Sequence, residues 1–312
     1  MSFTDEVKHE LIRYKNKNKQ AQKAELAALL RLTGSINIAD KKMAVKLKLR
    51  YGDLARMIFS WLKEEYQLEV EIRVFKPGKL EKSQTYLLYI PPQDKLINLL
   101  KELGIWSSEN SIDFSISDEF LVAGETGQAY LRGMFIGGGS INSPRSEYHL
   151  EFRCDYQSQA RDLIELLEIF SLTGKMIEHQ DKYMVYLKKY AEIVNLLNLI
   201  GAQKAQLKFE HASIIKEVKS NVNRKINFET ANLDKTIEAA IDQLEDIELV
   251  ATRRGLDNIP DSLREIARLR RQYPYASLKE LGEKLNPPLS KSGVNHRFRR
   301  LRKIAKNIRR GQ

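Results

Sequence analysis

Two spacings of apolar residues alternate along the first two hundred positions of the chain. In some segments apolar residues recur every three or four positions, which is typical of a helix with one buried face, and in others they recur every second position, which is typical of a half-buried strand. Positions 45–50 show the second spacing, since Val45, Leu47 and Leu49 alternate with basic residues. The pattern predicts a fold of the α+β class.

The same order of segments occurs twice. Each copy is predicted to run α-β-β-α-β-β-α, with the strand beside the first helix the least marked in the pattern. After a first apolar helix that ends at 34–37, the first copy continues with 45–50, 54–66, 70–75, 86–90 and 95–103. After a helix that ends at 139–142, the second continues with 149–154, 160–170, 175–179, 184–187 and 191–199. We expect the two copies to pack as a pseudo-symmetric pair, with the first longer mainly in its 76–84 loop.

Both first helices end at the tetrapeptide Gly-Ser-Ile-Asn, which begins at Gly34 in one copy and at Gly139 in the other. A glycine at the end of a helix predicts the left-handed conformation there. Small or apolar side chains also recur at every fourth position of both helices: Ala24, Ala28 and Leu32 in the first, Ala129, Gly133 and Gly137 in the second. This spacing predicts that the two helices pack closely against each other.

Positions 26–34 and 131–139 resemble two degenerate copies of the LAGLIDADG motif of homing endonucleases. In that family the paired motif helices form the interface of the repeats, strands build a saddle over DNA, and the acidic eighth motif residue holds a divalent metal. Those positions are Thr33 and Gly138 here, and neither can supply the carboxylate that such a cation prefers. The resemblance therefore implies the fold of this family without a metal site and without nuclease activity.

The face that would form the saddle differs between the copies. The first copy offers Lys46, Lys48 and Arg50, which could make secondary contacts to DNA phosphates, whereas the second offers the mixed set His149, Glu151 and Arg153. Two interpretations stay open at this point: weak DNA binding by the repeats, or contact with a protein partner.

Positive charge is concentrated near the end of the chain. The formal net charge is +11, and the residues from Ala251 onward hold 17 Lys and Arg against 5 Asp and Glu, a net of +12. A charge run can be simply a solvated face, but a surplus confined to one small segment favours a site for a polyanion.

This basic segment has the pattern of a helix-turn-helix. Ser262-x-x-Glu265 and Ser277-x-x-Glu280 are predicted capping boxes at two helix starts. Ser290 is predicted to cap a third helix, which would pack on the others through Val294, Phe298, Leu301 and Ala305. A polar and basic helix on such a support fits the major groove of double-stranded DNA, with Asn and Arg side chains able to pair with base edges. The candidate DNA-binding residues are Lys291, Ser292, Asn295, His296, Arg299, Arg300, Arg302, Lys303, Lys306 and Arg309.

Between the repeats and this segment the chain is polar and helical in pattern. Positions 221–232 are rich in Asn, which favours caps and turns, and we interpret them as a connector or, alternatively, as a contact surface. The expected organisation is a LAGLIDADG-like domain at 1–203 with repeats at about 21–104 and 126–201, a helical linker at 204–258, and a helix-turn-helix domain at 259–312.

The sequence gives little support for a disulfide, a metal site or a phosphate-binding loop. The single cysteine, Cys154, excludes an internal disulfide, the five histidines lack paired metal-ligand spacing, and 137–140 lacks the Lys of a phosphate loop. We expect no cofactor. The chain has no apolar stretch of membrane-spanning length and begins with an acidic amphipathic helix rather than a signal peptide, so we expect a cytoplasmic, nucleoid-associated protein without membrane contact.

The combination of a degenerate LAGLIDADG repeat with this helix-turn-helix resembles the WhiA family of sporulation and cell-division regulators of Gram-positive bacteria. The resemblance is carried by positions 3–8, 229–236 and 290–297 and covers nearly the whole chain. It implies promoter binding through the helix-turn-helix, and an RNA polymerase sigma factor as a partner. Two alternatives remain: an adaptor that recruits the sigma factor or division proteins, with DNA binding secondary, and a residual metal-dependent nuclease.

Overall fold

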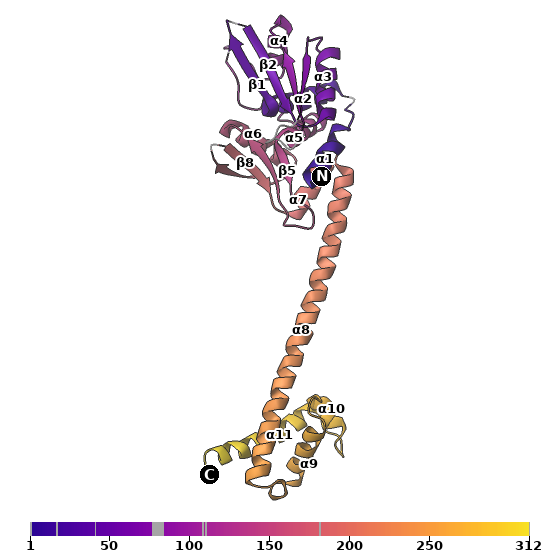
Figure 1. The fold of residues 1–312 in the computed structure, drawn as a ribbon, viewed down its shortest axis with the longest axis vertical. Coiled ribbons are helices and arrows are strands. Elements are labelled where there is room, and N and C mark those ends of the chain that lie inside the picture. Colours follow the sequence, from indigo (N-terminus) through magenta and orange to yellow (C-terminus); the bar gives the residue numbers. More distant parts are fainter. Residues whose placement is uncertain are drawn as a thin grey trace. The chain divides into compact units, whose positions relative to one another are not determined.

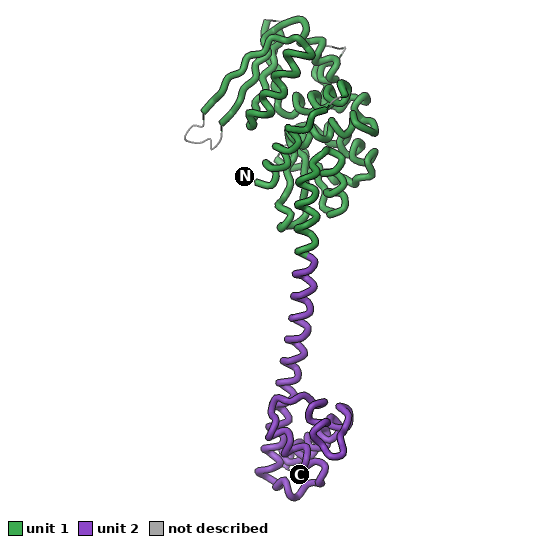
Figure 2. Tube along the Cα trace, turned by 90° about the vertical axis from the view of Figure 1, so that its right-hand side faces the viewer, with its two compact units in different colours: residues 1–216 green, residues 217–312 purple. Residues whose placement is uncertain are grey.

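A computed structural model describes residues 2–16, 18–40, 42–76, 84–107, 109, 111–180 and 182–311. The chain divides into two compact units, residues 1–216 and 217–312, which are coloured separately in Figure 2. Of the predicted 76–84 loop, positions 77–83 lie outside the described residues. None of the described helices is both long enough and apolar enough to cross a membrane.

The first unit contains the two predicted repeats (Figure 1). The first repeat consists of α2 (Lys19–Thr33), β1 (Gly34–Ala39), β2 (Lys42–Leu49), α3 (Gly52–Glu64), β3 (Glu71–Phe75), β4 (Thr85–Ile90) and α4 (Asp94–Glu102). The second consists of α5 (Glu125–Gly138), β5 (Gly139–Ile141), β6 (Leu150–Cys154), α6 (Gln157–Ile169), β7 (Lys175–His179), β8 (Lys182–Leu187) and α7 (Tyr190–Leu199). The α-β-β-α-β-β-α order and the α+β class are confirmed.

Each repeat forms one four-stranded antiparallel sheet, and the two sheets have the same topology. Their strand orders are β1-β2-β4-β3 and β5-β6-β8-β7. The registers also match, because Gly34 lies opposite Leu47 in the first sheet and Gly139 lies opposite Phe152 in the second. The alternation within 45–50 is explained by packing: α3 and α4 cover one face of the first sheet, so Leu47 is buried there while Lys46 and Lys48 are exposed on the other face.

The motif helices α2 and α5 pack against each other, as the spacing of small residues predicted. A Cβ atom at Gly133 would lie 2.5 Å from the carbonyl oxygen of Glu25 and 2.8 Å from the Cβ of Ala28, so only glycine permits this approach. The same interface contains a buried ion pair, with Arg132 Nε 3.1 Å from Glu25 Oε2.

The left-handed conformation predicted for the glycines that end these helices is wrong. Gly34 and Gly139 have φ of −89° and −80° and are extended, because each helix runs directly into the edge strand of its sheet. Glycine is needed there for space instead: a Cβ at Gly34 would lie 2.4 Å from the carbonyl oxygen of Leu30, and one at Gly139 would lie 2.5 Å from the ring of Phe135.

The N-terminal segment forms α1 (Phe3–Ile12), which packs against α3, α5 and β5. Val7 and Leu11 are buried in the core of the repeats. Glu10 accepts hydrogen bonds from the backbone N–H groups of Lys204 and Ala205, at 2.7 and 3.0 Å, and so satisfies orphan donors at the start of the next long helix, α8 (Gln203–Arg253).

The second unit has its own core. The C-terminal part of α8 is followed by η1 (Leu256–Asn258), α9 (Asp261–Gln272), α10 (Leu278–Glu283) and α11 (Lys291–Arg309). The four residues predicted to face inward from the third helix, Val294, Phe298, Leu301 and Ala305, are all buried. Ile247 and Val250 of α8 complete the same core.

Of the local predictions in this part of the chain, one is wrong and one is confirmed. Positions 221–232, interpreted as a connector or a contact surface, lie inside α8, because the modest helix penalty of the asparagines is offset by good helix formers between them. Ser262 forms no capping box, since α9 begins at Asp261 with Pro260 as its N-cap, so that Ser262 already lies inside the helix. The predicted box of Ser277 and Glu280 is present.

Candidate nucleic-acid interface

The helix α11 is anchored at its start and along one face. The Ser290 side chain accepts a hydrogen bond from the backbone N–H of Gly293 at 3.3 Å, which caps the helix. Its apolar face packs on α9 and α10, and Gly282 of α10 approaches the turn so closely that a Cβ there would lie 2.1 Å from the carbonyl oxygen of Leu289. The helix therefore has a fixed orientation on its support, with the opposite face turned to solvent.

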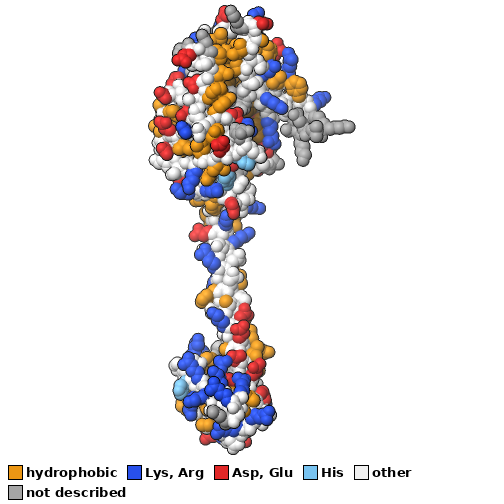
Figure 3. Space-filling model, turned by 90° about the vertical axis from the view of Figure 1, so that its left-hand side faces the viewer, with side chains coloured by type: hydrophobic (Ala, Val, Ile, Leu, Met, Phe, Trp, Pro, Cys, Tyr) orange, Lys and Arg blue, Asp and Glu red, His pale blue; other side chains and the backbone are white. Residues whose placement is uncertain are grey.

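The solvent face of α11 is polar and basic. Its exposed side chains are Ser292, His296, Arg299, Arg300, Lys303, Lys306 and Arg310, with Lys291 at the first turn. Among the described residues, no carboxylate lies within ion-pair distance of the Lys and Arg side chains in this set. Figure 3 shows Lys and Arg side chains crowded on the surface of the second unit. A helix with free cations along one face can approach a polyanion without first breaking internal pairs.

One flank of α11 turns toward α8 and is bound to it. Arg302 lies 2.9 Å from Asp242, and Arg309 lies 3.1 Å from Asp246. The pKa of Asp246 is raised by its burial, which Arg309 and Arg302 oppose. Two of the predicted DNA-binding arginines thus have carboxylate partners within the protein.

Asn295 lies on the same flank. It is half-buried and, together with Gln243 and Phe298, lines a cavity of about 160 Å³ between α8 and α11. Arg299 lines the same cavity but is exposed, so the two side chains differ in their exposure.

Two arginines that the sequence pattern did not single out, the half-buried Arg297 and the buried Arg270, hold the supporting helices together. Arg297 donates to the carbonyl oxygen of Ser262 and to Glu265, at 3.1 and 3.0 Å. Arg270 donates to Gln243 of α8 and to backbone carbonyls after α9, including Ala276 at 2.5 Å. Both occur in a run of basic residues, so composition alone could not separate them from the solvent-facing set.

On the first repeat, Lys46 and Lys48 lie together on the exposed face of β2. The register continues that face across the sheet, since Lys46 lies opposite Tyr89 and Lys48 opposite Leu87. Arg50 follows the strand and turns away toward α1, where it lies 3.8 Å from Asp5. The three predicted residues therefore do not form a single row.

The equivalent face of the second repeat is mixed in charge. Glu151 accepts a hydrogen bond from Ser140 at 3.1 Å and lies 2.9 Å from His149. Arg153 is exposed beside them. This face offers a neutral, hydrogen-bonded surface where its counterpart offers two lysines.

The ends of the two motif helices carry no carboxylate. The Thr33 hydroxyl donates to the carbonyl oxygen of Leu29 at 2.7 Å, within its own helix. Gly138 packs against Leu32 and the carbonyl oxygen of Arg153. Within the part of the chain that the structure describes, no three His, Cys, Asp or Glu side chains gather as metal ligands would.

The sequence and fold match a known family along the chain. The models that match are the WhiA N-terminal LAGLIDADG-like domain over residues 19–106, the WhiA LAGLIDADG-like domain over 127–219, and the WhiA C-terminal HTH domain over 222–305.

Individual relatives agree with these models. A Halothermothrix orenii protein named Probable cell division protein WhiA is 51% identical over 310 residues, 99% of each chain. A Clostridium botulinum protein of the same name is 41% identical over 314 residues, 100% of each chain. The crystal structure of full-length DUF199/WhiA from Thermatoga maritima aligns with a TM-score of 0.60 and 25% identity, covering 98% of this chain and 99% of that one. The chain belongs to the WhiA family.

Proposed function

We propose that this protein is a sequence-specific DNA-binding regulator of transcription that reads double-stranded DNA with the solvent face of α11. The observation that carries the proposal is the free basic face of a capped helix held on two further helices, which is the geometry of a major-groove reader. The match to a helix-turn-helix family model over 222–305 supports it.

The position of each side chain suggests a division of roles along α11. Ser292, His296 and Arg299 lie toward the N-terminal end, where a recognition helix meets base edges. Lys291 at the start of the helix and Arg300, Lys303 and Lys306 further along it are suited to phosphates, which position the protein without carrying sequence information. Arg302 and Arg309 are paired with Asp242 and Asp246 of α8, so in this proposal they position the helix.

The biological role proposed is control of cell-division genes, because the relatives at 51% and 41% identity are named as probable cell division proteins. A sigma factor of RNA polymerase is the proposed partner, in accordance with the family resemblance. A DNA-binding protein of this kind would act in the cytoplasm at the nucleoid.

We further propose that the repeats at 1–203 do not cut DNA. Thr33 and Gly138 cannot supply the motif carboxylates, and Thr33 is already bonded to its own helix. The repeats, the helical segment that follows and the helix-turn-helix would then serve as scaffold, connector and reader.

A second candidate function, recruitment of a protein partner by the repeats, is favoured by the mixed face around Glu151, which is poorly suited to a polyanion. It is compatible with DNA binding by α11, since the two surfaces belong to different units.

The proposed function is tested by mapping the genomic DNA bound in cells and then measuring binding isotherms on a mapped site and on random DNA. Arg299→Ala should weaken binding to the mapped site by about 1–3 kcal/mol and change binding to random DNA less. Arg268→Ala, an exposed arginine of α9, is the matched control and should leave both unchanged. Equal losses on both DNAs for Arg299→Ala would show that α11 does not read sequence. Incubation of the mapped site with the protein and Mg²⁺ or Mn²⁺ tests the absence of cleavage.

A further inference from the structure

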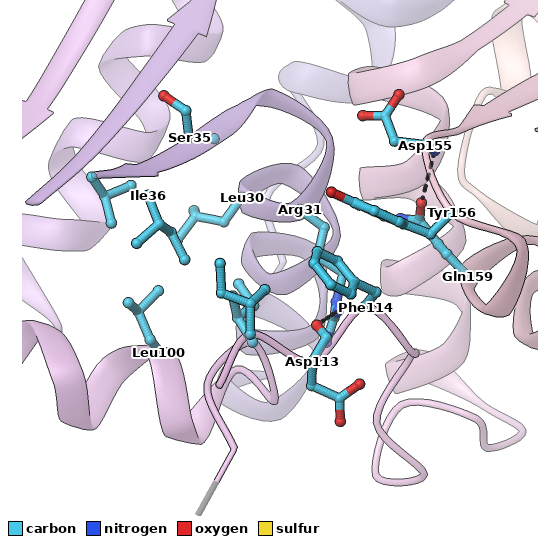
Figure 4. A pocket seen from close by; sticks show the side chains of 14 residues that line it. Leu30, Arg31, Ser35, Ile36, Leu100, Asp113, Phe114, Asp155, Tyr156 and Gln159 are labelled. Carbon is cyan, nitrogen blue, oxygen red and sulfur yellow. Dashed lines mark hydrogen bonds between the residues drawn. The ribbon is translucent and has the colours of Figure 1, made fainter. Parts of the chain in front are cut away.

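The cavity beside β1 is covered by the chain itself. It has a volume of about 310 Å³, and the segment after α4 lines one side of it with Ile112, Asp113 and Phe114 (Figure 4). Phe114 packs on Tyr156 with ring centroids 3.8 Å apart, and Arg31 donates to the carbonyl oxygen of Asp113 at 2.6 Å. This hollow therefore has its occupant within the chain.

The middle of α8 has no comparable cover among the described residues. Every residue from 217 to 235 is exposed. A helix surrounded by solvent is expected to be polar on all sides, yet Val218, Val222, Ile226 and Leu233 are between 50% and 59% exposed. A row of exposed apolar side chains indicates a surface that a partner covers.

This row continues through two further residues and is symmetric about its centre. The six members, which we call the α8 stripe, are Val218, Val222, Ile226, Leu233, Ile237 and Ile241. Each has a mate at the same distance on the other side of the midpoint between 229 and 230: 218 with 241, 222 with 237, and 226 with 233. Val222 and Leu233 are eleven residues apart, as are Ile226 and Ile237, and eleven residues make about three turns, so the stripe stays on one side of α8.

A symmetric stripe fits a second copy of the same helix. In an antiparallel pair with a two-fold axis between 229 and 230, Ile226 would pack on the partner's Leu233, Val222 on the partner's Ile237, and Val218 on the partner's Ile241. Every apolar side chain of the stripe then meets an apolar side chain. The stripe would cover about 36 Å of each helix. Most helices in proteins are stabilised by the packing of an apolar face, and the second copy would supply that packing here.

A parallel pair in register would also bring apolar residues together, but the charges along α8 favour the antiparallel orientation. From 217 to 226 there are three basic residues and one acidic residue, and from 229 to 241 there are three acidic residues and one basic residue. Antiparallel pairing places the basic half of one helix beside the acidic half of the other. Parallel pairing would place like charges together.

At its C-terminal end the stripe borders the second unit. Ile237 is half-buried and Ala240 is buried, whereas Ile241 is exposed. The core contacts that α8 makes through Ile247 and Val250 come after the stripe. The partner helix would therefore begin where the packing of the unit itself ends.

We propose that the α8 stripe is a dimerisation surface, on which α8 of a second copy of this chain packs in the antiparallel orientation. Such a dimer would carry two copies of α11 and so could bind two half-sites, whereas DNA binding by a single α11 does not require it.

The orientation is tested with single cysteines in the full chain. The one natural cysteine, Cys154, is buried. Thr230→Cys places a thiol beside the two-fold axis, so oxidised glutathione should convert this variant to a disulfide-linked dimer. Val222→Cys should stay unlinked, because the two thiols of an antiparallel pair would lie about 22 Å apart along the helices. Non-reducing gels separate the products, with the wild type as the control for Cys154.

The contribution of the stripe is tested by sedimentation equilibrium over a range of protein concentrations. Ile226→Glu should raise the dissociation constant of the dimer by about a hundredfold, since each buried isoleucine is worth about tenfold and a symmetric dimer loses two. Phe228→Glu is the matched control and should leave it unchanged. Phe228 is also exposed but lies about 200° around α8 from Ile226, outside the stripe.

Three results would overturn the proposal. A wild type that sediments as a single chain at every concentration would show that something other than a second copy covers the stripe. Disulfide-linked dimers of both cysteine variants would show a parallel pair, and equal effects of Ile226→Glu and Phe228→Glu would place the dimer contact elsewhere. None of these measurements contains DNA, so they do not test the proposed function.

Discussion

Arg132 and Glu25 pair across the contact of α5 with α2, with both side chains buried and 3.1 Å between Nε and Oε2. Arg132 also donates to the carbonyl oxygen of Ile200 at 3.0 Å and stacks over the ring of Tyr14 at 4.1 Å. Burial raises the pKa of Glu25, and the guanidinium of Arg132 opposes the rise. A single arginine therefore joins the motif helices, the end of α7 and the segment after α1.

Replacement of one member of this pair should lower the free energy of unfolding far more than replacement of both. Arg132→Met leaves the Glu25 carboxylate buried without a partner, and we expect a loss of about 3–5 kcal/mol in the free energy of unfolding. Because removal of Arg132 also removes the cation that opposes the rise in the pKa of Glu25, ionisation of this carboxyl costs more in the variant than in the wild type, so the loss should grow as the pH rises. The double variant Glu25→Leu with Arg132→Met should lie close to the wild type, apart from the lost bond to Ile200. Denaturant unfolding at pH 5 and pH 8 measures all three, and a double variant as weak as Arg132→Met would contradict the argument.

Even the smallest enlargement at the helix contact should destabilise the repeats. In Gly133→Ala the new methyl group would meet the Glu25 carbonyl oxygen and Ala28, and we expect a loss of about 1–3 kcal/mol. Gly293→Ala is the matched control: it is also helical, and the nearest atom to its Cβ lies at 3.6 Å, so it should gain a few tenths to about 1 kcal/mol. Thermal unfolding compares the two, and equal stability of Gly133→Ala and wild type would argue against a close crossing.

The contact between α1 and the repeats should depend on pH through Asp5. Although burial acts to raise it, hydrogen bonds from Tyr51 and Ser2 lower the pKa of this carboxyl from 3.8 to about 2. A lowered pKa stabilises the fold above pH 3.8, and this contribution is lost as the pH falls toward 2. Asp5→Asn should therefore be less stable than the wild type at pH 7, with a difference that shrinks below pH 4. Unfolding curves between pH 2 and 7 test this, with the exposed carboxyl variant Glu178→Gln as the control.

The repeats were predictable because their signals are local. Alternation within 45–50 and the small residues around Gly133 each depend on the immediate environment of one strand or one helix, and both were confirmed. The conformation of Gly34 was not predictable, since glycine is required equally by a left-handed backbone and by a tight contact, and the sequence does not distinguish these causes. The partners of Arg302 and Arg309 lie on α8, about sixty residues earlier, and no pattern within α11 reveals them.

Because Ile247 and Val250 of α8 belong to the core of the second unit, the smallest fragment that should fold and bind DNA must contain them. Both side chains are fully buried in the core that contains Leu263 and Phe298. A fragment 236–312 keeps them and the carboxylates of Asp242 and Asp246, so it should unfold cooperatively and bind DNA. A fragment 255–312 contains α9, α10 and α11 but lacks this side of the core, and it should show weak helicity and no sharp transition. Circular dichroism during heating measures both, and cooperative unfolding of 255–312 would show that α8 is dispensable.

Variants at two neighbouring residues of α11, Arg302 and Lys303, should distinguish a role in stability from a role in DNA binding. Arg302 is paired with Asp242 and lies 3.8 Å from the buried Asp246, whereas Lys303 faces solvent. Arg302→Ala should therefore lower the stability of the second unit by about 1 kcal/mol, since the pair is partly exposed, and leave the salt dependence of DNA binding nearly unchanged. Lys303→Ala should have the opposite pattern, with wild-type stability and a salt slope reduced by about one unit, because one phosphate contact is lost.

Measurement of both quantities on both variants makes this comparison decisive. Thermal unfolding of 236–312 gives the stability, and binding isotherms on random DNA between low and moderate salt give the slope. If Arg302→Ala lowers the slope as much as Lys303→Ala does, Arg302 leaves its carboxylate partners to bind phosphate, and the assignment of Arg302 and Arg309 as positioning residues is wrong. If neither variant changes the slope, the phosphates are held elsewhere, and Lys46 and Lys48 on the first repeat become the next candidates, because they lie together on one exposed face.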